Sequence, residues 1–180
     1  MTDRFLYASP LDPRATPLLD DLVREYDARY GDFFGPAGGT NEVTRYPPEA
    51  FAPPEGNFLL LLRGDETIGG GAFRRYDETT AEFKRIWTRS DLRRQGLARA
   101  LVQELEAQAL RQGYTRVFLM TGCRQPEAAN LYLTSGYRAL FDSAADLEAL
   151  RILPFEKQLL LRNDRCLTQS RDDRRPASPG

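Results

Sequence analysis

A chain of 180 residues with 41% apolar and 28% charged side chains is long enough for one globular domain and too short for two domains of ordinary size. Its 25 basic and 26 acidic residues nearly cancel, which excludes a surface that attracts nucleic acid or anionic lipid by overall charge. Histidine is absent, so a Ser-His-Asp triad, a Cys-His pair and a histidine-bound zinc are excluded as well.

The cysteines and the hydropathy predict a soluble, cytoplasmic protein. Cys123 and Cys166 are too few for a disulfide framework or a four-cysteine metal site, and two free thiols are the simplest interpretation. The N-terminus lacks the apolar segment of a signal peptide, and the longest aliphatic run, residues 58–62, is much shorter than the roughly 20 residues of a membrane span. We therefore expect no membrane partner.

The N-terminal half predicts one helix, an irregular segment and a meander of strands. Apolar residues recur at helical spacing between Pro17 and Gly31, which predicts an amphipathic helix that ends at the glycine. The many Gly and Pro residues of segment 32–55 predict a loop with a short turn near residues 48–51, and such a loop either serves function or simply connects elements. Three antiparallel strands follow, at residues 57–62, 67–75 and 81–88.

The C-terminal half predicts two helices and three strands. A helical face begins at Leu97 and ends near Gly113, and a second helix extends from Pro126 to Gly136. The expected strands lie at residues 116–121, 137–141 and 153–160. We expect a single domain over residues 1–161 and a poorly ordered tail over residues 162–180, where the chain has little apolar content.

This order of elements predicts an α+β domain in which about four helices flank a mixed, mostly antiparallel sheet of six to seven strands. The connection from strand 81–88 through the long helix to strand 116–121 should form a right-handed, parallel crossover. Ligands tend to enter such sheets where neighbouring strands part at their carboxyl ends. A binding site is therefore expected at the start of the long helix.

The segment Arg93-Arg94-Gln95-Gly96-Leu97-Ala98 opens that helix. Its two small residues leave the first-turn N–H groups accessible, and these groups lie at the positive end of the helix dipole, which favours phosphate oxygens. Six cations and one acid lie between Lys84 and Arg99. No P-loop and no GxGxxG motif before a helix is present, which argues against ATP and dinucleotides. The pattern predicts a diphosphate site, with an ordinary solvated helix start as the alternative.

The run Arg93-x-x-Gly96-x-Ala98 resembles the acetyl-CoA diphosphate signature of the GNAT superfamily of N-acetyltransferases. The stretch AEFKRIWTRSDLRRQGLARALVQELEAQALRQGY, followed by FLMTGCRQPEAANLYLTSGY, is similar to the two central motifs of that family, and LPFEKQL resembles its last strand. The resemblance implies a GNAT-type sheet splayed at its central parallel pair, acetyl-CoA as cofactor, and transfer of an acetyl group to a primary amine. The segment TGCRQPEA suggests a branch that acts on small molecules.

The same resemblance assigns two catalytic roles. Glu82, eleven residues before Arg93, is the expected general base, and Glu127 is a second choice; the alternative for Glu82 is a strand carboxylate paired with Lys84 or an arginine. Tyr132 is the expected general acid, with a core aromatic as the alternative. A phenol with a pKa of about 10 is matched to a leaving thiolate of pKa about 8.5–10 in a dry site.

The resemblance also implies the cofactor contacts. Main-chain N–H groups of the third strand would meet the oxyanion and the pantetheine arm. Family members often have Asn, in contact with the pantetheine arm, at the position of Gln125. Gln125 departs from that pattern. No metal is required. The expected cofactor-binding residues are Ile86, Trp87, Thr88, Arg93, Arg94, Gln95, Gly96, Leu97, Ala98, Arg99, Gln125, Asn130 and Tyr132.

For the acceptor we expect a small amine, amino-acid-like or polyamine-like, that attacks acetyl-CoA directly in a ternary complex. Tyr30 and Phe34 are expected in the wall of its pocket, and Arg45 or Arg74 would hold a carboxylate; the alternative is that the loop aromatics only pin the loop to the core. Two other functions stay open: an acyl-CoA-binding domain without turnover, and an acetyltransferase for protein N-termini or lysines. No nucleic-acid partner is expected, and no residue decides whether C-terminal strands pair two copies into a homodimer.

Overall fold

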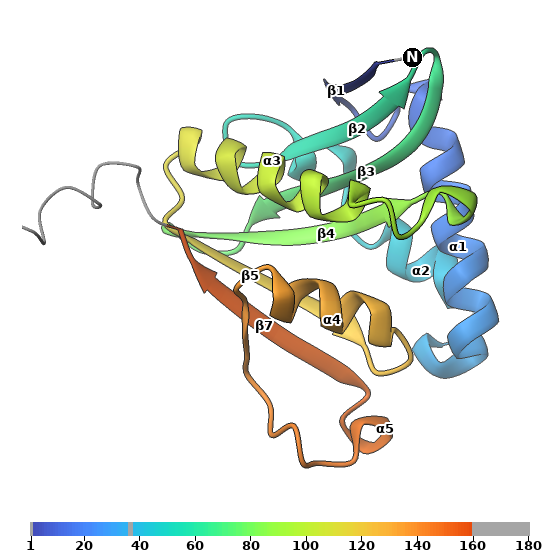
Figure 1. Ribbon diagram of the computed structural model, residues 1–180, viewed down its shortest axis with the longest axis vertical. Helices are drawn as coiled ribbons and strands as arrows, with labels where there is room; N and C mark the ends of the chain where they lie inside the picture. The colour runs from blue at the N-terminus through green and yellow to red at the C-terminus, as the bar shows by residue number, and fades with distance from the viewer. Residues whose placement is uncertain (1, 36–37, 160–180) are drawn as a thin grey trace, which may run out of the picture.

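The structure is a computed structural model that describes residues 2–35 and 38–159. Its strands form one sheet in the order β1-β2-β3-β4-β5-β7-β6, in which β4 and β5 are parallel and the other paired neighbours are antiparallel (Figure 1). The strands are β1 Asp3–Ala8, β2 Asn57–Arg63, β3 Glu66–Arg75, β4 Thr80–Thr88, β5 Arg116–Gly122, β6 Arg138–Ala139 and β7 Ile152–Gln158. The expected α+β fold with a mixed sheet of six to seven strands is thereby confirmed, and the sheet has seven strands.

Helices cover both faces of this sheet. The α-helices are α1 Thr16–Tyr30, α2 Gly38–Thr44, α3 Leu97–Arg111, α4 Pro126–Thr134 and α5 Leu147–Leu150; 3-10 turns lie at η1 Pro13–Ala15, η2 Gly31–Phe34, η3 Pro48–Phe51 and η4 Ser90–Leu92. α1, α2 and η3 pack on one face in a core that contains Leu18, Val43 and Phe51, whereas α3 and α4 pack on the other with Leu101, Leu105 and Tyr132. None of these helices is both long and apolar enough to cross a membrane.

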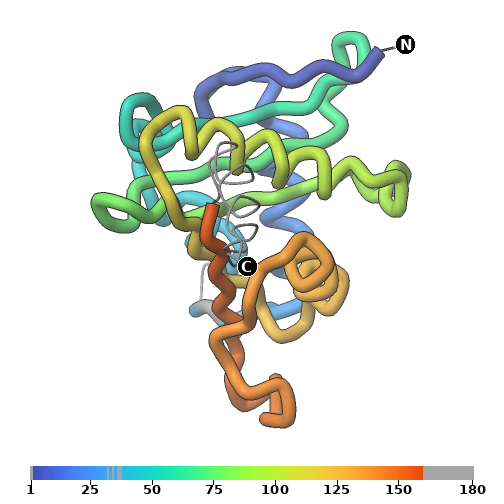
Figure 2. The backbone as a smooth tube through the Cα atoms, turned by 60° about the vertical axis from the view of Figure 1, so that its left-hand side comes forward, coloured from blue at the N-terminus to red at the C-terminus, as the bar shows by residue number. Residues whose placement is uncertain are grey.

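The segment between β6 and β7, which carries α5, projects away from the rest of the molecule in both views (Figure 1, Figure 2). Arg124 in the β5–α4 connection reaches this segment through its ion pair with Glu148, at 3.0 Å. Arg151 donates a hydrogen bond of 3.3 Å to the carbonyl of Phe33, which lies just after α1. The projecting segment is therefore tied to the end of α1.

β2 is buried along almost its whole length because it lies between the two helical layers. Successive side chains of a strand point to opposite faces, so Phe58 and Leu60 join the α1 side while Leu59 and Leu61 join the α3 side. Opposite them, Gly71 of β3 leaves room for the α3 layer: a Cβ built there would lie 2.9 Å from Leu105 Cδ1. The run of glycines in β3 thus permits close packing of helix on sheet.

β4 and β5 pair only from Thr80 opposite Arg116 to Phe83 opposite Leu119. Beyond that point both strands continue, but no register joins them. The expected splay of the central parallel pair therefore begins after Phe83, and it opens toward the start of α3.

A β-bulge in β4 follows the last paired position. Gly70 pairs with Trp87 and Ala72 pairs with Lys84, so two residues of β4 face one residue of β3. The first of the two, Arg85, has a φ of 59°. The bulge shifts the alternation of side chains, and Trp87 consequently packs on the α1 side.

One strand and two α-helices, β1, α2 and α5, are absent from the sequence-based prediction. β1 was missed because its six residues have mixed polarity and only its pairing with β2 defines it. α5 has four residues and no buried side chain. The segment predicted as one loop, residues 32–55, contains α2 in addition to the expected turn at η3, and the predicted strand 137–141 is reduced to the two residues of β6. The end of the predicted strand 153–160 and the predicted tail 162–180 extend outside the described residues.

α2 escaped prediction because glycines begin it. They serve close packing here: a Cβ on Gly39 would lie 2.6 Å from the carbonyl oxygen of Val23 in α1. Asp27 of α1 accepts a hydrogen bond of 2.7 Å from the Gly39 N–H. Contact with α1, rather than helix propensity, therefore stabilises α2.

Candidate active site

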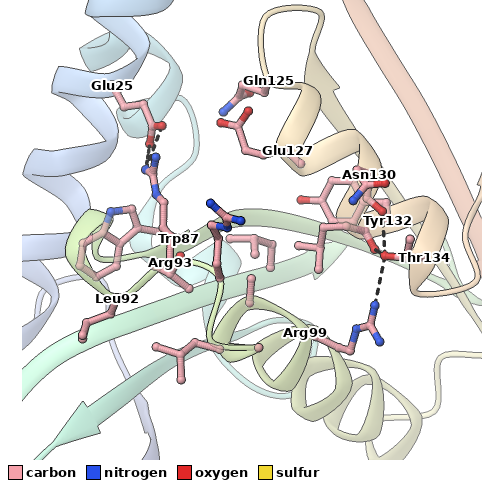
Figure 3. A pocket seen from close by; sticks show the side chains of 18 of the residues that line it. Glu25, Trp87, Leu92, Arg93, Arg99, Gln125, Glu127, Asn130, Tyr132 and Thr134 are labelled. Atoms are coloured by element: carbon pink, nitrogen blue, oxygen red, sulfur yellow. Dashed lines mark hydrogen bonds and ion pairs between the residues drawn. The ribbon is translucent and has the colours of Figure 1, made fainter.

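A cavity of about 800 Å³ lies where β4 and β5 part. The last residues of β4, the turn before α3, the first turn of α3 and one face of α4 line it (Figure 3). Of the expected cofactor-binding residues, only Gln95 does not line it. Glu25 and Arg29 of α1 complete the wall, so the cavity reaches from one helical layer to the other through the opening in the sheet.

The turn before α3 presents main-chain N–H groups that no side chain caps. Gly96, the N-cap, has a φ of 80°, and a Cβ built on it would meet no heavy atom within 4 Å. Arg94, two residues earlier, is also in the left-handed region, with a φ of 65°. Uncapped donors at the positive end of a helix attract anions, so the turn fits the diphosphate that the motif predicts.

Three arginines stand around this turn, and two of them already have partners. Arg93 donates to both carboxylate oxygens of Glu25, at 3.0 and 3.2 Å, and Arg99 donates to the hydroxyl of Thr134 at 3.2 Å (Figure 3). Arg94 also lines the cavity. Of the six cations expected between Lys84 and Arg99, these three line the cavity, whereas Lys84, Arg85 and Arg89 do not.

α1 contributes an ion-pair network that the sequence did not reveal. Arg29 lies 2.8 Å from Glu25 and also forms a very close ion pair with Glu127 of α4. Arg29 further donates a hydrogen bond of 2.6 Å to the carbonyl of Arg124. The pairing with Arg29 lowers the pKa of Glu127 against an opposing effect of burial. The network joins α1 to both walls of the opening.

Tyr132 lines the cavity from α4 and is itself buried. Its ring packs against Tyr137 and Phe155, with a centroid distance of 5.7 Å to each. Burial raises the pKa of Tyr132 well above its ordinary value, because the phenolate would lose its hydration. The hydroxyl is therefore protonated at neutral pH, but its pKa lies farther above that of a thiolate than the sequence-based match assumes.

β4 has no register partner at Ile86. Ile86 lines the cavity, yet it has no partner in the register of β3 and lies beyond the last residue that pairs with β5. Thr88 lines the cavity farther along the strand. Trp87 between them turns to the other side, where its indole N–H donates to Asp21 at 2.7 Å. The part of β4 beyond its pairing with β5 therefore borders the cavity.

Glu82 does not line the cavity. Its side chain is buried on the α2 side of β4, where Oε2 lies 2.6 Å from Arg74 Nη2 and Oε1 lies 3.2 Å from Lys84 Nζ. The contact with Arg74 is an ion pair whose geometry does not make a hydrogen bond, because Glu82 Oε2 has no hydrogen-bond partner. Arg74 Nε has none either. This arrangement is the paired carboxylate that the sequence left open as the alternative to a base.

The expected acceptor residues do not gather in one place. Arg74 lies over the ring of Tyr46, with its guanidinium carbon 4.2 Å from the centroid, and contacts Glu82 rather than open space. Arg45 is largely exposed and lies 3.6 Å from Glu42. Tyr30 is buried at the end of α1, and burial raises its pKa to about 12. Phe34 ends η2, and its side chain lies outside the described part of the chain.

Sequence reasoning missed Glu25 and Arg29 as parts of the site. Their spacing of four residues on a helix is typical of an exposed ion pair, and exposed pairs seldom carry function. Glu127 was noticed only as a second candidate base. The many aromatic and charged residues of α1 were the available signal for a functional helix. The sequence does not show which face of that helix meets the cavity.

A model of the acetyltransferase (GNAT) family matches residues 19–137 of the chain. The chain belongs to this family. The matched region includes most of α1, the Gly96 turn and α4, and it contains every residue that lines the cavity.

A curated relative is the uncharacterized N-acetyltransferase YsnE of Bacillus subtilis (strain 168), which is 32% identical over 92 residues. The match covers 50% of this chain and 61% of the relative, so the GNAT chain described here spans less than two thirds of that protein.

Solved structures of the family share the fold. A Klebsiella pneumoniae protein assigned to the acyl-CoA N-acyltransferases superposes with a TM-score of 0.68 at 23% identity, covering 88% of this chain and 99% of the other. A GNAT family acetyltransferase from Elizabethkingia anophelis, solved with acetyl-CoA bound, gives a TM-score of 0.61 at 16% identity, with coverage of 87% and 98%.

Proposed function

We propose that the protein transfers the acetyl group of acetyl-CoA to the primary amine of a small molecule, by direct attack within a ternary complex. The observation that carries this proposal is the cavity through the sheet, which joins an uncapped helix start, an unpaired strand edge and a buried tyrosine. The amine would occupy the α1 side of the cavity while the cofactor occupies the α3 side.

The residues present fit acetyl-CoA. The open turn at Gly96 and the arginines Arg93, Arg94 and Arg99 would hold its phosphates, and the edge at Ile86 and Thr88 would hold its pantetheine arm. When bound, the cofactor supplies an acetyl thioester activated toward amines. Gln125 and Asn130 lie on the opposite wall, where their amides can reach a bound ligand.

Three groups of this chain would then serve the reaction. The N–H of Ile86 would stabilise the negative charge that develops on the carbonyl oxygen. Tyr132 would donate its proton to the leaving sulfur. Glu82 would accept the proton of the amine through water, because its carboxylate is buried away from the cavity; Glu127, which lines the cavity, is the competing acceptor.

A small acceptor is favoured by the way the α1 side is closed. Arg29 and Arg124 exchange hydrogen bonds with each other's main-chain carbonyls, at 2.6 and 2.9 Å, and Arg124 pairs with Glu148 of α5. These contacts hold the end of α1 against the β5–α4 connection and α5. An extended polypeptide would have to break them to reach the cavity, whereas a small amine would not.

The test combines the purified protein and acetyl-CoA with a panel of amino acids, polyamines and a peptide with a free N-terminus, while release of free thiol and the mass of the product are measured. We expect thiol release that depends on a small amine and an acetylated product of that amine. Release with the peptide alone would indicate a protein acetyltransferase. Cofactor binding without release in any mixture would indicate a binding domain without turnover.

A further inference from the structure

Arg85 occupies an unusual backbone conformation at the point where the sheet opens. Its φ of 59° lies in the left-handed region, which is unfavourable for a residue with a Cβ. Together with Ile86 it forms the bulge of β4, since both residues lie between the paired positions Lys84 and Trp87. A glycine would adopt this conformation without strain, so the arginine side chain must compensate for it locally.

The side chain of Arg85 is anchored on the α2 side of the sheet. Its guanidinium donates a very close hydrogen bond to the carbonyl of Val43, near the end of α2. The guanidinium carbon also lies 4.2 Å from the ring centroid of Phe51 in η3, and that ring is buried. Burial lowers the pKa of Arg85, as expected for a cation enclosed by these two elements.

The anchor has a consequence on the other side of the strand. Because of the bulge, Lys84 and Arg85 both face α2, where Lys84 lies near Glu42 and Arg85 contacts Val43. The next residue, Ile86, turns its side chain to the α3 side, and the register pairs it with no residue of β3 or β5. Ile86, which lines the cavity, thus belongs to a bulge that Arg85 fastens from the α2 side.

We propose that Arg85 is a positioning residue of this acetyltransferase: through Val43 and Phe51 it fastens the β4 bulge so that the Ile86 N–H is directed at the thioester carbonyl. The inference rests on the proposed function for the identity of that carbonyl. It makes α2 and η3, which do not line the cavity, determinants of the rate of acetyl transfer.

Two variants and a matched control test the role of the anchor. Arg85→Gly keeps the left-handed conformation accessible and removes the side-chain contacts with Val43 and Phe51. Arg85→Lys keeps the positive charge but lacks the planar guanidinium. Arg151→Gly is the control, since Arg151 also has a positive φ, of 63°, lies 3.8 Å from the ring centroid of Phe33 and donates to a main-chain carbonyl, but does not line the cavity.

We expect Arg85→Gly to lower kcat roughly ten- to a hundredfold while the Kd of CoA changes less than about threefold, because a misdirected donor acts mainly on the transition state. Arg85→Lys should lose less than Arg85→Gly, and Arg151→Gly should stay within about twofold of the parent. If Arg85→Gly does not fold, a reduced kcat of the folded Arg85→Lys variant supports the inference in its place. A parent-like kcat in the folded Arg85 variants would overturn the inference.

A binding measurement separates this inference from the proposed function. S-ethyl-CoA, a thioether, lacks the carbonyl that the Ile86 N–H would meet, so the parent should bind acetyl-CoA about three- to tenfold more tightly in calorimetry. Arg85→Gly should abolish this preference and Arg151→Gly should keep it. If the parent acetylates no amine but the preference follows Arg85, the proposed function fails and the positioning role stands. A preference that is absent from the parent, or unchanged in Arg85→Gly, overturns the positioning role.

Discussion

The two sides of the open sheet are built in different ways. On the α3 side, one short stretch, residues 86–99, supplies the strand edge, the turn and most of the cavity's cations. On the α1 side, the cavity is closed by Glu25, Arg29 and Glu127, which come from helices about a hundred residues apart and meet through ion pairs. Under the proposed function, cofactor recognition would depend on local main-chain geometry, whereas acceptor recognition would depend on tertiary contacts.

The largest expected effect belongs to the α3 side. Tyr132→Phe should lower kcat by about a hundredfold or more and leave the Kd of acetyl-CoA within about twofold, because it removes only the proton donor. Since burial raises the pKa of Tyr132, the donor stays protonated as the pH increases, and kcat of the parent should not fall through its ionisation below about pH 10. An unchanged kcat in steady-state assays would remove Tyr132 from the mechanism.

The next prediction separates the two carboxylates that face different sides. Glu82→Gln should lower kcat/KM at pH 7 by roughly ten- to a hundredfold if its proton-accepting role is correct, and Glu127→Gln by less than about threefold. Glu82→Gln also leaves Arg74 and Lys84 without their buried partner, so a lower Tm should accompany it. A reversed order of the two rate effects would move the base to the cavity wall.

One added methyl group at Gly96 tests whether the backbone conformation of the turn before α3 matters for CoA binding. Gly96→Ala forces a side chain into a φ of 80°, although no heavy atom lies within 4 Å of the new Cβ. We expect about tenfold weaker binding of CoA by calorimetry, because the turn must shift. Gly113→Ala is the matched control, with a φ of 95° and equally open space at the far end of α3. Equal affinities of the two variants would show that the turn's geometry is unimportant.

The smallest effect addresses the link between the two sides. Glu25→Gln should free Arg93 from its ion pair and strengthen CoA binding about two- to fivefold at low salt, with the gain disappearing at high salt. Asp20→Asn, elsewhere on α1, changes the net charge equally and serves as the control. A weaker affinity in Glu25→Gln would mean that Glu25 orients Arg93 for the phosphates instead of competing with them.

Much of the α3 side could be predicted because its signals are short in sequence. The strand at Arg116–Gly122 was expected within one residue of its end, and the helix from Leu97 began where the glycine turn indicated. The splay followed from the resemblance and is confirmed by the end of the β4–β5 register at Phe83. Glu82 shows the limit: its position on β4 was predicted correctly, but its two cationic partners, and its separation from the cavity, were not decided by spacing.

The amino-acid sequence alone determined the order of the central elements, the glycine turn before α3 and the tyrosine of α4, because periodicity, glycine conformation and helix termini act within a few residues. Tertiary structure alone decided that α2 forms, that α1 closes the cavity, and that Arg85 reaches Val43 and Phe51. Those features arise from contacts between segments far apart in the chain. These contacts stabilise the protein only when both segments are packed together, so no local sequence pattern predicts them.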